Sequence, residues 1–361
     1  MNKLKKQNIL YLPSYNYLSE PIFENLIQYM KEFNNICYDI GSCYYKKIEK
    51  SEIFDKYYFL NYNKNTKNNK LITLSKILYQ KKNIVKVIKK ISPSIIISTT
   101  DLGFPIKIIR KVLPNIPFVV IQSALFNYEE NTYNKLSKFL YLIDKQKNYL
   151  NEYEDTHLLL WGKFFEKNIK TNNQNIYCTG NIAFDNLPFK EKSKYILIGT
   201  SVLKEIIGEK SEQKLLDIII HFIKKNQNLK FIIKPHPRDD IDLITKLFNF
   251  PNIQISQVKI ENLLKNASVY ITFNSATLLT ALAMKVPIIN ILSQELLKYD
   301  ILKNQFNERV FDVNELEKKV KYLIANPEEQ FYSNNINNLL CSLDRKAAYR
   351  ASNVIKGILC K

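Results

Sequence analysis

The alternation of short apolar runs with longer amphipathic segments constrains the fold of this chain more than any other feature. The runs that we predict as strands are rich in Ile, Leu and Val and cover Asn8–Leu12, Ser94–Ser98, Phe118–Gln122, Thr156–Leu160, Asn175–Thr179, Tyr195–Gly199, Lys230–Lys234, Ile253–Ile255, Ser268–Phe273 and Pro287–Ile291. Helices are predicted at Pro21–Phe33, Lys70–Ile91, Gly103–Leu113, Glu212–Lys225, Asp240–Phe248, Ala276–Met284, Val313–Ala325 and Asp344–Leu359. Apolar strands separated by helices are typical of parallel sheets covered on both faces, so we predict an α/β fold.

The length of the chain predicts two domains of this kind. At about 100–200 residues per domain, 361 residues suffice for two packed units. Residues 186–194 form a charged stretch that contains Pro188, and we place the hinge there. We therefore expect one α/β domain at residues 1–188, a second at 189–340, and a C-terminal helix at 341–361 that packs back on the first domain.

The chain is strongly basic, with 53 Lys and Arg against 34 Asp and Glu and a formal net charge of +19. A basic protein suits anionic partners such as nucleic acid, a membrane surface or a phosphorylated substrate. Lys, Asn, Ile, Tyr and Phe also have AT-rich codons, so genome composition alone can tilt the charge. Because the lysines are scattered and do not cluster with aromatic residues on one element, we expect no nucleic-acid partner.

The cysteines and the apolar runs indicate a cytoplasmic protein. The five cysteines are odd in number and show no CxxC spacing, which favours reduced thiols over a disulfide framework or a zinc site. No stretch approaches the about 18–20 uninterrupted apolar residues of a membrane span, and the run at Ile9–Leu12 is too short for a signal-peptide core. We expect a cytoplasmic protein that associates with a membrane only peripherally, at its inner face.

Polar residues gather where predicted strands end, which is where ligands bind in open parallel sheets. One strand runs into Lys234-Pro-His236-Pro-Arg238, a turn whose prolines restrict the backbone on both sides of the histidine. Three cationic or hydrogen-bonding side chains on a rigid turn suit a phosphate or a ribose. The other histidines, His157 and His221, lie in a predicted strand and a predicted helix, and we assign them no role in the site.

Hydroxyl groups follow two further predicted strands. After the strand that ends at residue 273 come Asn274, Ser275 and Thr277, which can cap a helix or direct hydroxyl and amide groups at a phosphate. After the strand that ends at residue 199 the candidates for a turn near phosphate, or for an ordinary glycine turn, are Gly199, Thr200 and Ser201. Neither GxGxxG nor GxxxxGK[ST] is present, so the sequence has no dinucleotide fingerprint and no P-loop.

One carboxylate stands at a predicted strand end in the N-terminal half. Asp101 follows the strand at Ser94–Ser98, and it can act as a general base on an acceptor hydroxyl or cap the helix that comes next. Both interpretations stay open. Gln122 and Ser123 mark another strand end of that half. Zinc-protease and serine-hydrolase functions have no support, because HExxH, GxSxG and clustered Cys and His ligands are all absent.

Four passages stand out when the chain is taken in order. They are Trp161-Gly162 with Thr179-Gly180-Asn181 and Phe184-Asp185, then Lys234-Pro235-His236-Pro237, then Glu261–Ala267, then Asn274-Ser275-Ala276-Thr277. In this order they resemble the GT-B superfamily of nucleotide-sugar enzymes. Within it they look like bacterial surface-polysaccharide glycosyltransferases, a group with sialyl-, polysialyl- and Kdo-transferases and CDP-glycerol transferases. The resemblance spans most of the chain.

The resemblance implies two Rossmann-like domains whose parallel sheets face each other across a cleft. The N-terminal domain would face the acceptor, and the C-terminal domain would bind the nucleotide sugar. The implied catalytic residues are Asp101, as the base, and His236. Together with the strand-end analysis, it gives the expected donor-binding residues as Gly199, Thr200, Ser201, Lys234, His236, Arg238, Asn274, Ser275 and Thr277.

The implied reaction is direct displacement at the anomeric carbon of the donor by a hydroxyl of a capsule or lipooligosaccharide acceptor. Many members carry a carboxylate for the ribose where this chain has Thr280, a departure that favours a CMP-activated sugar over a UDP sugar. DxD is absent, and basic groups would handle the donor phosphate, so we expect no cofactor and no obligatory metal. An anionic membrane surface is a further expected partner, because a lipid-linked acceptor would lie there.

Three alternatives remain. A UDP-GlcNAc 2-epimerase has the same architecture, but the loop after residue 199 lacks a basic run and the helix after Asn274 carries no acidic pair. The net charge leaves a nucleic-acid-binding protein as a second alternative, at lower rank. The third is a non-catalytic protein of the same fold, since Thr280 and the single acidic residue at Asp101 are also compatible with lost activity.

Overall fold

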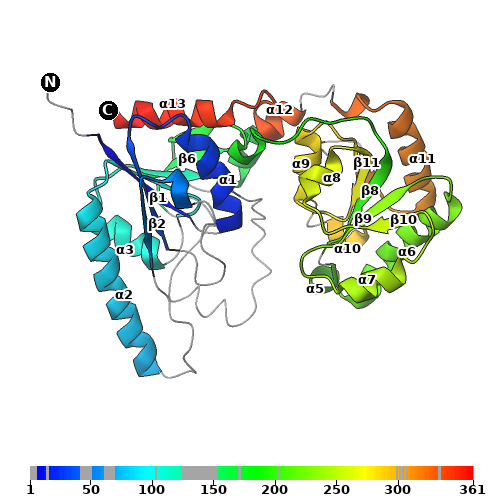
Figure 1. Ribbon diagram of the computed structural model, residues 1–361, viewed down its shortest axis with the longest axis horizontal. Coiled ribbons are helices and arrows are strands. Elements are labelled where there is room, and N and C mark those ends of the chain that lie inside the picture. The colour runs from blue at the N-terminus through cyan, green and yellow to red at the C-terminus, as the bar shows by residue number, and fades with distance from the viewer. Residues whose placement is uncertain are drawn as a thin grey trace. The chain divides into compact units, whose positions relative to one another are not determined.

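The computed structural model describes residues 6–13, 16–40, 51–60, 70–101, 104–123, 153–169, 172–201, 203–297, 300, 302, 305, 308–331 and 335–360. The chain divides into two compact units, shown in Figure 1. Unit 1 comprises Met1–Asn186 and Asn337–Lys361, and unit 2 comprises Leu187–Ile336. The chain therefore leaves unit 1 once and returns to it near the C-terminus.

Unit 1 is built on a seven-stranded sheet whose order is β3-β2-β1-β4-β5-β6-β7. All of its strand pairs are parallel. The strands are β1 (Asn8–Leu12), β2 (Asn34–Asp39), β3 (Lys56–Phe59), β4 (Ile95–Ser98), β5 (Phe118–Ile121), β6 (His157–Leu160) and β7 (Ile176–Cys178). The described helices are α1 (Asn16–Ile27), α2 (Lys70–Ile91), α3 (Phe104–Val112), α12 (Asn335–Leu340, begun in unit 2) and α13 (Ala347–Leu359), with 3-10 turns η1 (Ser51–Ile53), η2 (Lys163–Asn168) and η3 (Ile182–Phe184).

Unit 2 is built on a six-stranded sheet, order β10-β9-β8-β11-β12-β13, which is also parallel throughout. Its strands are β8 (Tyr195–Gly199), β9 (Phe231–Lys234), β10 (Ile253–Ile255), β11 (Ala267–Thr272), β12 (Ile288–Ile291) and β13 (Arg309–Val310). Its described helices are α5 (Leu203–Ile207), α6 (Glu209–Lys225), α7 (Ile241–Leu247), α8 (Ile260–Leu264), α9 (Thr277–Ala283), α10 (Gln294–Leu297) and α11 (Val313–Ala325), with the 3-10 turn η4 (Glu329–Phe331).

In its own numbering, the sheet of unit 2 has the strand order 3-2-1-4-5-6 of a Rossmann-like domain, and the sheet of unit 1 has the same order with a seventh strand beside the sixth. The predicted α/β class with two Rossmann-like parallel-sheet domains is confirmed. In this order the direction of winding reverses between the first and fourth strands, which are β1 and β4 in unit 1 and β8 and β11 in unit 2. Ligands of such sheets bind outside the carboxyl ends of the strands at that switch point.

The strand β11 shows how the sequence separates a core face from a polar face. Val269, Ile271 and Phe273 are buried in the hydrophobic core of unit 2. The intervening side chains Ser268 and Thr272 donate hydrogen bonds to backbone carbonyls of β8, at 2.7 Å each. Because successive side chains of a strand point to opposite faces, one face of β11 is apolar and the other carries hydroxyl groups.

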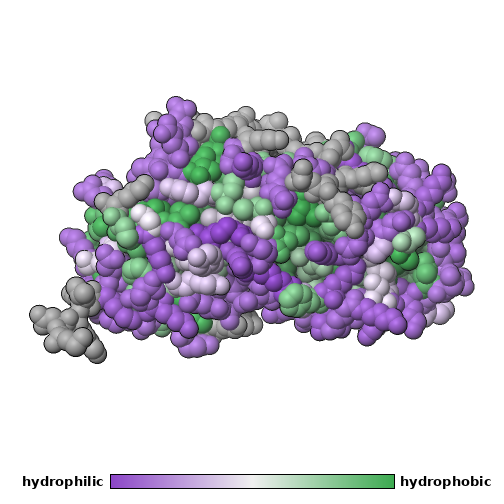
Figure 2. All heavy atoms as spheres, turned by 90° about the horizontal axis from the view of Figure 1, so that it is seen from above, coloured by the Kyte–Doolittle hydropathy of each residue, from purple (hydrophilic) through white to green (hydrophobic). Residues whose placement is uncertain are grey.

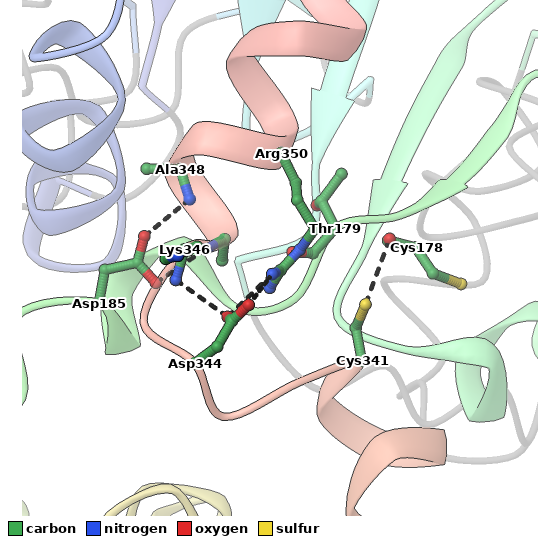
Figure 3. A network of polar contacts seen from close by, with 9 residues as sticks. Cys178, Thr179, Asp185, Cys341, Asp344, Lys346, Ala348 and Arg350 are labelled. Carbon is green, nitrogen blue, oxygen red and sulfur yellow. Dashed lines mark hydrogen bonds and ion pairs between the residues drawn. The ribbon is translucent and has the colours of Figure 1, made fainter.

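The C-terminal helix α13 is held to unit 1 by residues of the passage that resembles GT-B enzymes. The carboxylate of Asp185 accepts hydrogen bonds from the backbone N–H groups of Ala347, at 3.0 Å, and Ala348, at 2.7 Å. Arg350 donates to the carbonyl of Thr179 at 2.9 Å and forms an ion pair with Asp344, as Figure 3 shows. Asp185 therefore acts as a cap for a helix that begins 162 residues later.

The glycine of the same passage is required by close packing. A Cβ at Gly162 would lie 2.3 Å from the carbonyl oxygen of Asn338 and 2.6 Å from the carbonyl carbon of Leu339, both in the backbone of α12. That distance is far below van der Waals contact, and a backbone atom cannot rotate away. Together with Asp185, this glycine gives the passage a structural role in docking the C-terminal segment.

Three strands, the short helices α5, α8, α10 and α12, and the bounds of several longer helices differ from the sequence predictions. The strands β2, β3 and β13 were not predicted, because β2 begins with two asparagines, β3 is only four residues long and β13 only two. The helix α1 begins at Asn16, and Pro21 lies inside it where the prediction placed the start. Proline is most frequent in the first turn of a helix, so it is a weaker boundary marker one turn later.

The surface face in Figure 2 is mainly hydrophilic, with scattered hydrophobic residues.

Among the described residues, no helix combines the length and the apolar composition that crossing a bilayer requires. The described cysteines, Cys37, Cys178, Cys341 and Cys360, are free thiols.

Candidate functional site

The candidate site of unit 2 lies at the carboxyl ends of three adjacent strands. The strands β9, β8 and β11 are neighbours in the sheet, and β8 and β11 flank the switch point. Their ends lead into Lys234–Arg238, Gly199–Ser201 and Asn274–Thr277, so the fold brings together all nine predicted donor-binding residues at one edge of one sheet. The sequence predicts each of these strand ends separately. The strand order of the sheet shows that they are neighbours.

The loops after β8 and β9 are joined by hydrogen bonds that centre on Thr200 and Asp239. The backbone N–H of His236 donates to the hydroxyl of Thr200 at 2.7 Å and to the carboxylate of Asp239 at 2.8 Å. The Thr200 hydroxyl in turn donates to the same carboxylate. The backbone N–H of Thr200 donates to the carbonyl of Lys234 at 3.1 Å, so hydrogen bonds of both backbone and side chains join the two loops.

The imidazole of His236 has a defined donor side. The backbone N–H of Arg238 donates to its Nδ1 at 3.2 Å, so Nδ1 acts as an acceptor and the proton of the neutral ring is on Nε2. Burial lowers the pKa of His236 below its ordinary value, and the neighbouring cations of Arg238 and Lys234 act in the same direction against the attraction of Asp239. These effects favour the neutral ring, which has one N–H, at Nε2, to offer a ligand.

The two cationic side chains of the turn differ in their engagement. The ammonium group of Lys234 donates to the carbonyl of Pro235 at 3.0 Å, which folds the side chain back over the turn. The guanidinium of Arg238 forms an ion pair with Glu205 of α5 at 2.8 Å, and both side chains are largely exposed. An exposed ion pair of this kind is worth little in water, so a phosphate can compete for the arginine.

The loop after β11 begins with a residue in the left-handed region. Asn274 has a φ of 50°, a conformation that asparagine adopts more readily than most residues. Its backbone N–H donates to the side-chain oxygen of Asn290 on β12 at 2.7 Å. Asn290 is fully buried, and its amide contacts the carboxylate of Asp300, which is paired with Arg309. A buried polar chain from β13 and β12 thus sets the start of this loop.

The hydroxyl groups of this loop are connected to each other and to a buried tyrosine. The hydroxyl of Ser275 lies 2.8 Å from that of Thr277, and the hydroxyl of Thr277 lies 2.5 Å from that of Tyr270 on β11. Ser275 and Thr277 are half-buried, whereas Tyr270 is fully buried. Helix capping does not explain these contacts between hydroxyl groups. A capping side chain accepts from backbone N–H groups, and here only the 3.4 Å contact from the N–H of Thr277 to the hydroxyl of Ser275 is of that kind.

The remaining site residues of unit 2 are Gly199 and Ser201. Gly199 ends β8, and a Cβ there would lie 2.3 Å from the hydroxyl oxygen of Tyr270. Close packing against Tyr270 is therefore a second reason for a glycine at this position, besides the predicted turn near a phosphate. Ser201 is half-buried, and its carbonyl accepts from the N–H of Leu203 at the start of α5.

Asp101 belongs to unit 1 and follows β4 at the switch point of that sheet. Its side chain is fully buried. Its role as a general base stays a prediction, as does the alternative of a helix cap, because the next two residues lie outside the described part of the chain. Gln122, the other strand-end residue of unit 1, accepts from the N–H of Trp161 at 3.0 Å and is used structurally.

Sequence analysis missed three residues of the site's framework: Asp239, Tyr270 and Asn290. Asn290 had a usable signal, since it is the only polar residue in the strand sequence IINI. Tyr270 had a weaker one, the alternation of Ser268, Tyr270 and Thr272 with apolar residues along β11. Asp239 had none, because an aspartate beside an N-cap aspartate is ordinary turn composition.

Solved structures of sugar-nucleotide enzymes share this fold. A Listeria monocytogenes protein, described as a candidate UDP-N-acetylglucosamine 2-epimerase, aligns with a TM-score of 0.66 at 15% identity, over 98% of this chain and 96% of that one. The UDP-GlcNAc 2-epimerase of Neisseria meningitidis bound to UDP-GlcNAc aligns with 0.61 at 13% identity, over 97% and 100%. A glycosyltransferase from Rickettsia africae ESF-5 aligns with 0.60 at 14% identity, over 99% and 100%.

No family model matches the sequence, and no curated protein matches it. At 13–15% identity the likeness establishes the fold alone. It confirms the two-domain GT-B type of fold, and it does not select the sialyl-, Kdo- or CDP-glycerol transferases among proteins of that fold.

Proposed function

We propose that the protein is a nucleotide-sugar-dependent glycosyltransferase and that unit 2 binds the donor through its phosphate. The observation that carries the proposal is the convergence of hydrogen-bond donors at the switch point of that sheet. They are the Nε2–H of His236, the ammonium group of Lys234 and the hydroxyls of Ser275 and Thr277. A phosphate accepts hydrogen bonds and carries negative charge, so this donor set suits it.

The proposed reaction is a direct displacement. An acceptor hydroxyl attacks the anomeric carbon of the donor, the bond from that carbon to the phosphate oxygen breaks, and the nucleotide leaves with the electron pair. Negative charge grows on the leaving phosphate, where the donors of unit 2 stabilise it. The proton of the acceptor hydroxyl passes to a base, for which we propose Asp101 of unit 1.

The proposed reaction needs no metal ion, because the donor groups of unit 2 neutralise the leaving phosphate. Among the described residues, no group of three or more His, Cys, Asp and Glu could hold a metal ion. Because the proposal assigns the leaving phosphate to the donor groups of unit 2, transfer is expected to continue in EDTA. Activity that is lost in EDTA and restored by Mg²⁺ would show that this part of the proposal is wrong.

The nucleotide of the donor is identified by thermal unfolding of the wild type with CMP, CDP, UMP, UDP and GDP. Thr280 lies in α9, three residues after Thr277, and offers no carboxylate to a ribose. This supports a CMP-activated donor, so we expect the largest rise in Tm with CMP. A largest rise with UDP would replace the CMP donor by a UDP donor. If none of the five nucleotides raises the Tm, the proposed function is wrong.

A second candidate function is epimerisation of a UDP-sugar, which the structural likeness to UDP-GlcNAc 2-epimerases favours. The two functions differ in their need for an acceptor. Incubation with UDP-GlcNAc alone, followed by NMR of the sugar, separates them. A transferase leaves the configuration at C2 unchanged, and conversion at C2 would establish the epimerase in its place.

The acceptor and the location follow from the same proposal. We propose a glycan or glycolipid of the capsule or lipooligosaccharide type as acceptor, and a cytoplasmic protein that meets it at the inner membrane face. The net charge of +19 supports this, because basic proteins are attracted to anionic lipid. Failure to bind anionic vesicles at low salt would remove the membrane from the proposal and leave the donor site unaffected.

A further inference from the structure

The tyrosine at the centre of β11 has a polar contact that its burial makes costly to lose. Tyr270 has 1% of its surface exposed and is one of the largest fully buried side chains of the described chain. Its hydroxyl nevertheless lies 2.5 Å from the hydroxyl of Thr277, at the start of α9. A phenylalanine would fill the same space without a polar atom to satisfy, so the hydroxyl calls for an explanation.

The same hydroxyl lies against the end of β8. A Cβ at Gly199 would be 2.3 Å from the Tyr270 oxygen and 3.0 Å from the ring carbon that bears it. The carbonyl of Gly199 accepts from the hydroxyl of Thr272 at 2.7 Å. Residue 200, the next in the chain, holds the backbone of His236. The Tyr270 hydroxyl therefore lies between the end of β8, whose loop contacts His236, and the hydroxyl of Thr277 at the start of α9.

The number of protons on these hydroxyl groups limits the directions in which their hydrogen bonds can run. Each hydroxyl has one proton, and that of Thr272 is committed to the carbonyl of Gly199. If Tyr270 donates to Thr277 and Thr277 donates to Ser275, the proton of Ser275 is left to point out of the chain of hydroxyls. The reverse order would direct it inward. An anionic ligand next to Ser275 favours the first order, in which each hydrogen bond strengthens the next.

The tyrosine keeps its proton under all ordinary conditions. Burial raises the pKa of Tyr270 above its ordinary value. The Tyr270 hydroxyl therefore always has a proton to donate. It contacts the hydroxyl of Thr277 and interacts with that of Thr272, whose own proton goes to the carbonyl of Gly199.

We propose that Tyr270 is a positioning residue that orients the hydroxyls of Thr277 and Ser275 toward the donor phosphate and seats Gly199 beside them. The proposal rests on the proposed function, since it assumes a phosphate at this edge of the sheet. It adds a residue that touches no substrate and that the strand-end analysis did not include.

The first test measures the affinity for UDP and CMP by calorimetry in Tyr270→Phe, Thr277→Val and the double variant. We expect each single variant to bind the preferred nucleotide about 5–10-fold more weakly, because an oriented hydroxyl donor to a charged group is lost. The double variant should be no weaker than Thr277→Val, since both changes break one chain of hydroxyls. Additive losses, or an unchanged affinity in Tyr270→Phe, would overturn the proposal.

The matched control is Tyr195→Phe. Tyr195 is a half-buried tyrosine of the same sheet whose hydroxyl donates to the carbonyl of Leu263 at 2.7 Å, away from the site. It should lose stability as Tyr270→Phe does and keep the nucleotide affinity of the wild type. An equal loss of affinity in both variants would mean that Tyr270 acts only through stability, and would overturn its positioning role.

The second test needs no ligand. Gly199→Ala places a methyl group against the tyrosine hydroxyl and should lower the Tm, and the same substitution in the Tyr270→Phe background should lower it less. An equal loss in both backgrounds would show that the hydroxyl does not seat Gly199. If this coupling is found but neither nucleotide binds the wild type, the proposed function fails and the orienting role falls with it, while the steric half of the proposal stands.

Discussion

Asp239 carries a single carboxylate that organises the turn after β9. It accepts from the backbone of His236 and from the hydroxyl of Thr200, and so links the loops after β9 and β8. These bonds leave the imidazole with its Nδ1 toward Arg238 and its Nε2 available. The carboxylate therefore controls the direction of the histidine without contacting its ring.

Replacing Asp239 by Ala should weaken both the fold and the site. The N–H of His236 and the hydroxyl of Thr200 would lose an ionic acceptor, which predicts a loss of about 1–3 kcal/mol in the free energy of unfolding. Denaturant unfolding measures this loss, and nucleotide affinity should fall with it. Asp242→Ala is the control, because that carboxylate is exposed on α7. Equal stability of the two variants would contradict this role of Asp239.

Glu308 is a buried carboxyl that the candidate site does not use. It is fully buried, and both carboxyl oxygens lack a hydrogen-bond partner in the part of the chain that the structure describes. Burial raises the pKa of Glu308 to about 7, and the negative charge of Asp300 adds to the rise, against the attraction of Arg309 and Lys319. The folded protein therefore holds this proton more tightly than the unfolded chain does.

This difference fixes the sign of a pH effect. Between the ordinary pKa of 4.5 and about 7, the unfolded chain releases the proton while the folded protein keeps it. The free energy of unfolding therefore falls as pH rises through this window, by up to about 3 kcal/mol from this group. Glu308→Gln should remove most of that fall, which denaturant unfolding at pH 5 and pH 8 measures.

Glu328→Gln, at an exposed position of the same unit, serves as the control and should leave the pH dependence unchanged. The comparison of variant with wild type cancels the other groups that titrate between pH 5 and pH 8. A Glu308→Gln variant with the same fall in stability as the wild type would contradict the account of the buried carboxyl.

The residues of the candidate site were predictable from sequence only where they follow a strand with an unusual composition. Lys234 and His236 stand between prolines, and Ser275 and Thr277 follow a clear apolar strand. Their roles depend on partners that sequence order hides. Thr277 meets Tyr270 because a strand and the helix after it fold together, a contact that no spacing rule specifies.

At the scale of elements, the C-terminal helix α13 depends on residues from far earlier in the chain. Asp185 caps its first turn and Arg350 ties it to the loop after β7, as drawn in Figure 3. The helix packs on α1 through apolar residues of the unit 1 core. A passage that resembles nucleotide-sugar enzymes thus contributes to the architecture, because its aspartate accepts hydrogen bonds from backbone amides.

Asp185→Ala should loosen this helix. Two backbone N–H groups of α13 would lose their acceptor, which predicts a loss of about 1–2 kcal/mol, the usual cost of removing a cap. Hydrogen exchange would show the amides of α13 exchanging faster while those of β8 in unit 2 stay unchanged. Asp185→Asn keeps one acceptor oxygen and should recover part of the protection. Unchanged exchange in Asp185→Ala would contradict the capping role.

The central strands were the most predictable elements. β1 and β8 have the bounds that the apolar runs indicated, because strands buried on both faces are apolar almost throughout. The edge strand β10 also has the predicted bounds, although its central residue Gln254 is exposed. The edge strand β3 has four part-exposed or exposed residues, so its sequence carries no such signal. β13 is a strand because it pairs with β12, and a segment of two residues is too short to show a strand pattern in the sequence.

The two units share one strand order over six strands, to which unit 1 adds a seventh, and each has a switch point with polar residues. The length of the chain and its alternating pattern were sufficient to predict two such units. The net charge of +19 is less informative, because lysines are exposed on helices of both units as well as at the site. The functional signal therefore lies in the few basic and hydroxyl groups at the strand ends of unit 2.

Calorimetry of the wild type, His236→Ala and Ser275→Ala with the nucleotide that stabilises the protein most tests directly where the nucleotide phosphate binds. Each variant removes one donor at the switch point of unit 2, so each should bind at least about tenfold more weakly. His221→Ala, an exposed histidine on α6, should bind like the wild type. Unchanged affinity in both site variants would contradict the placement of the nucleotide phosphate at the ends of β8, β9 and β11.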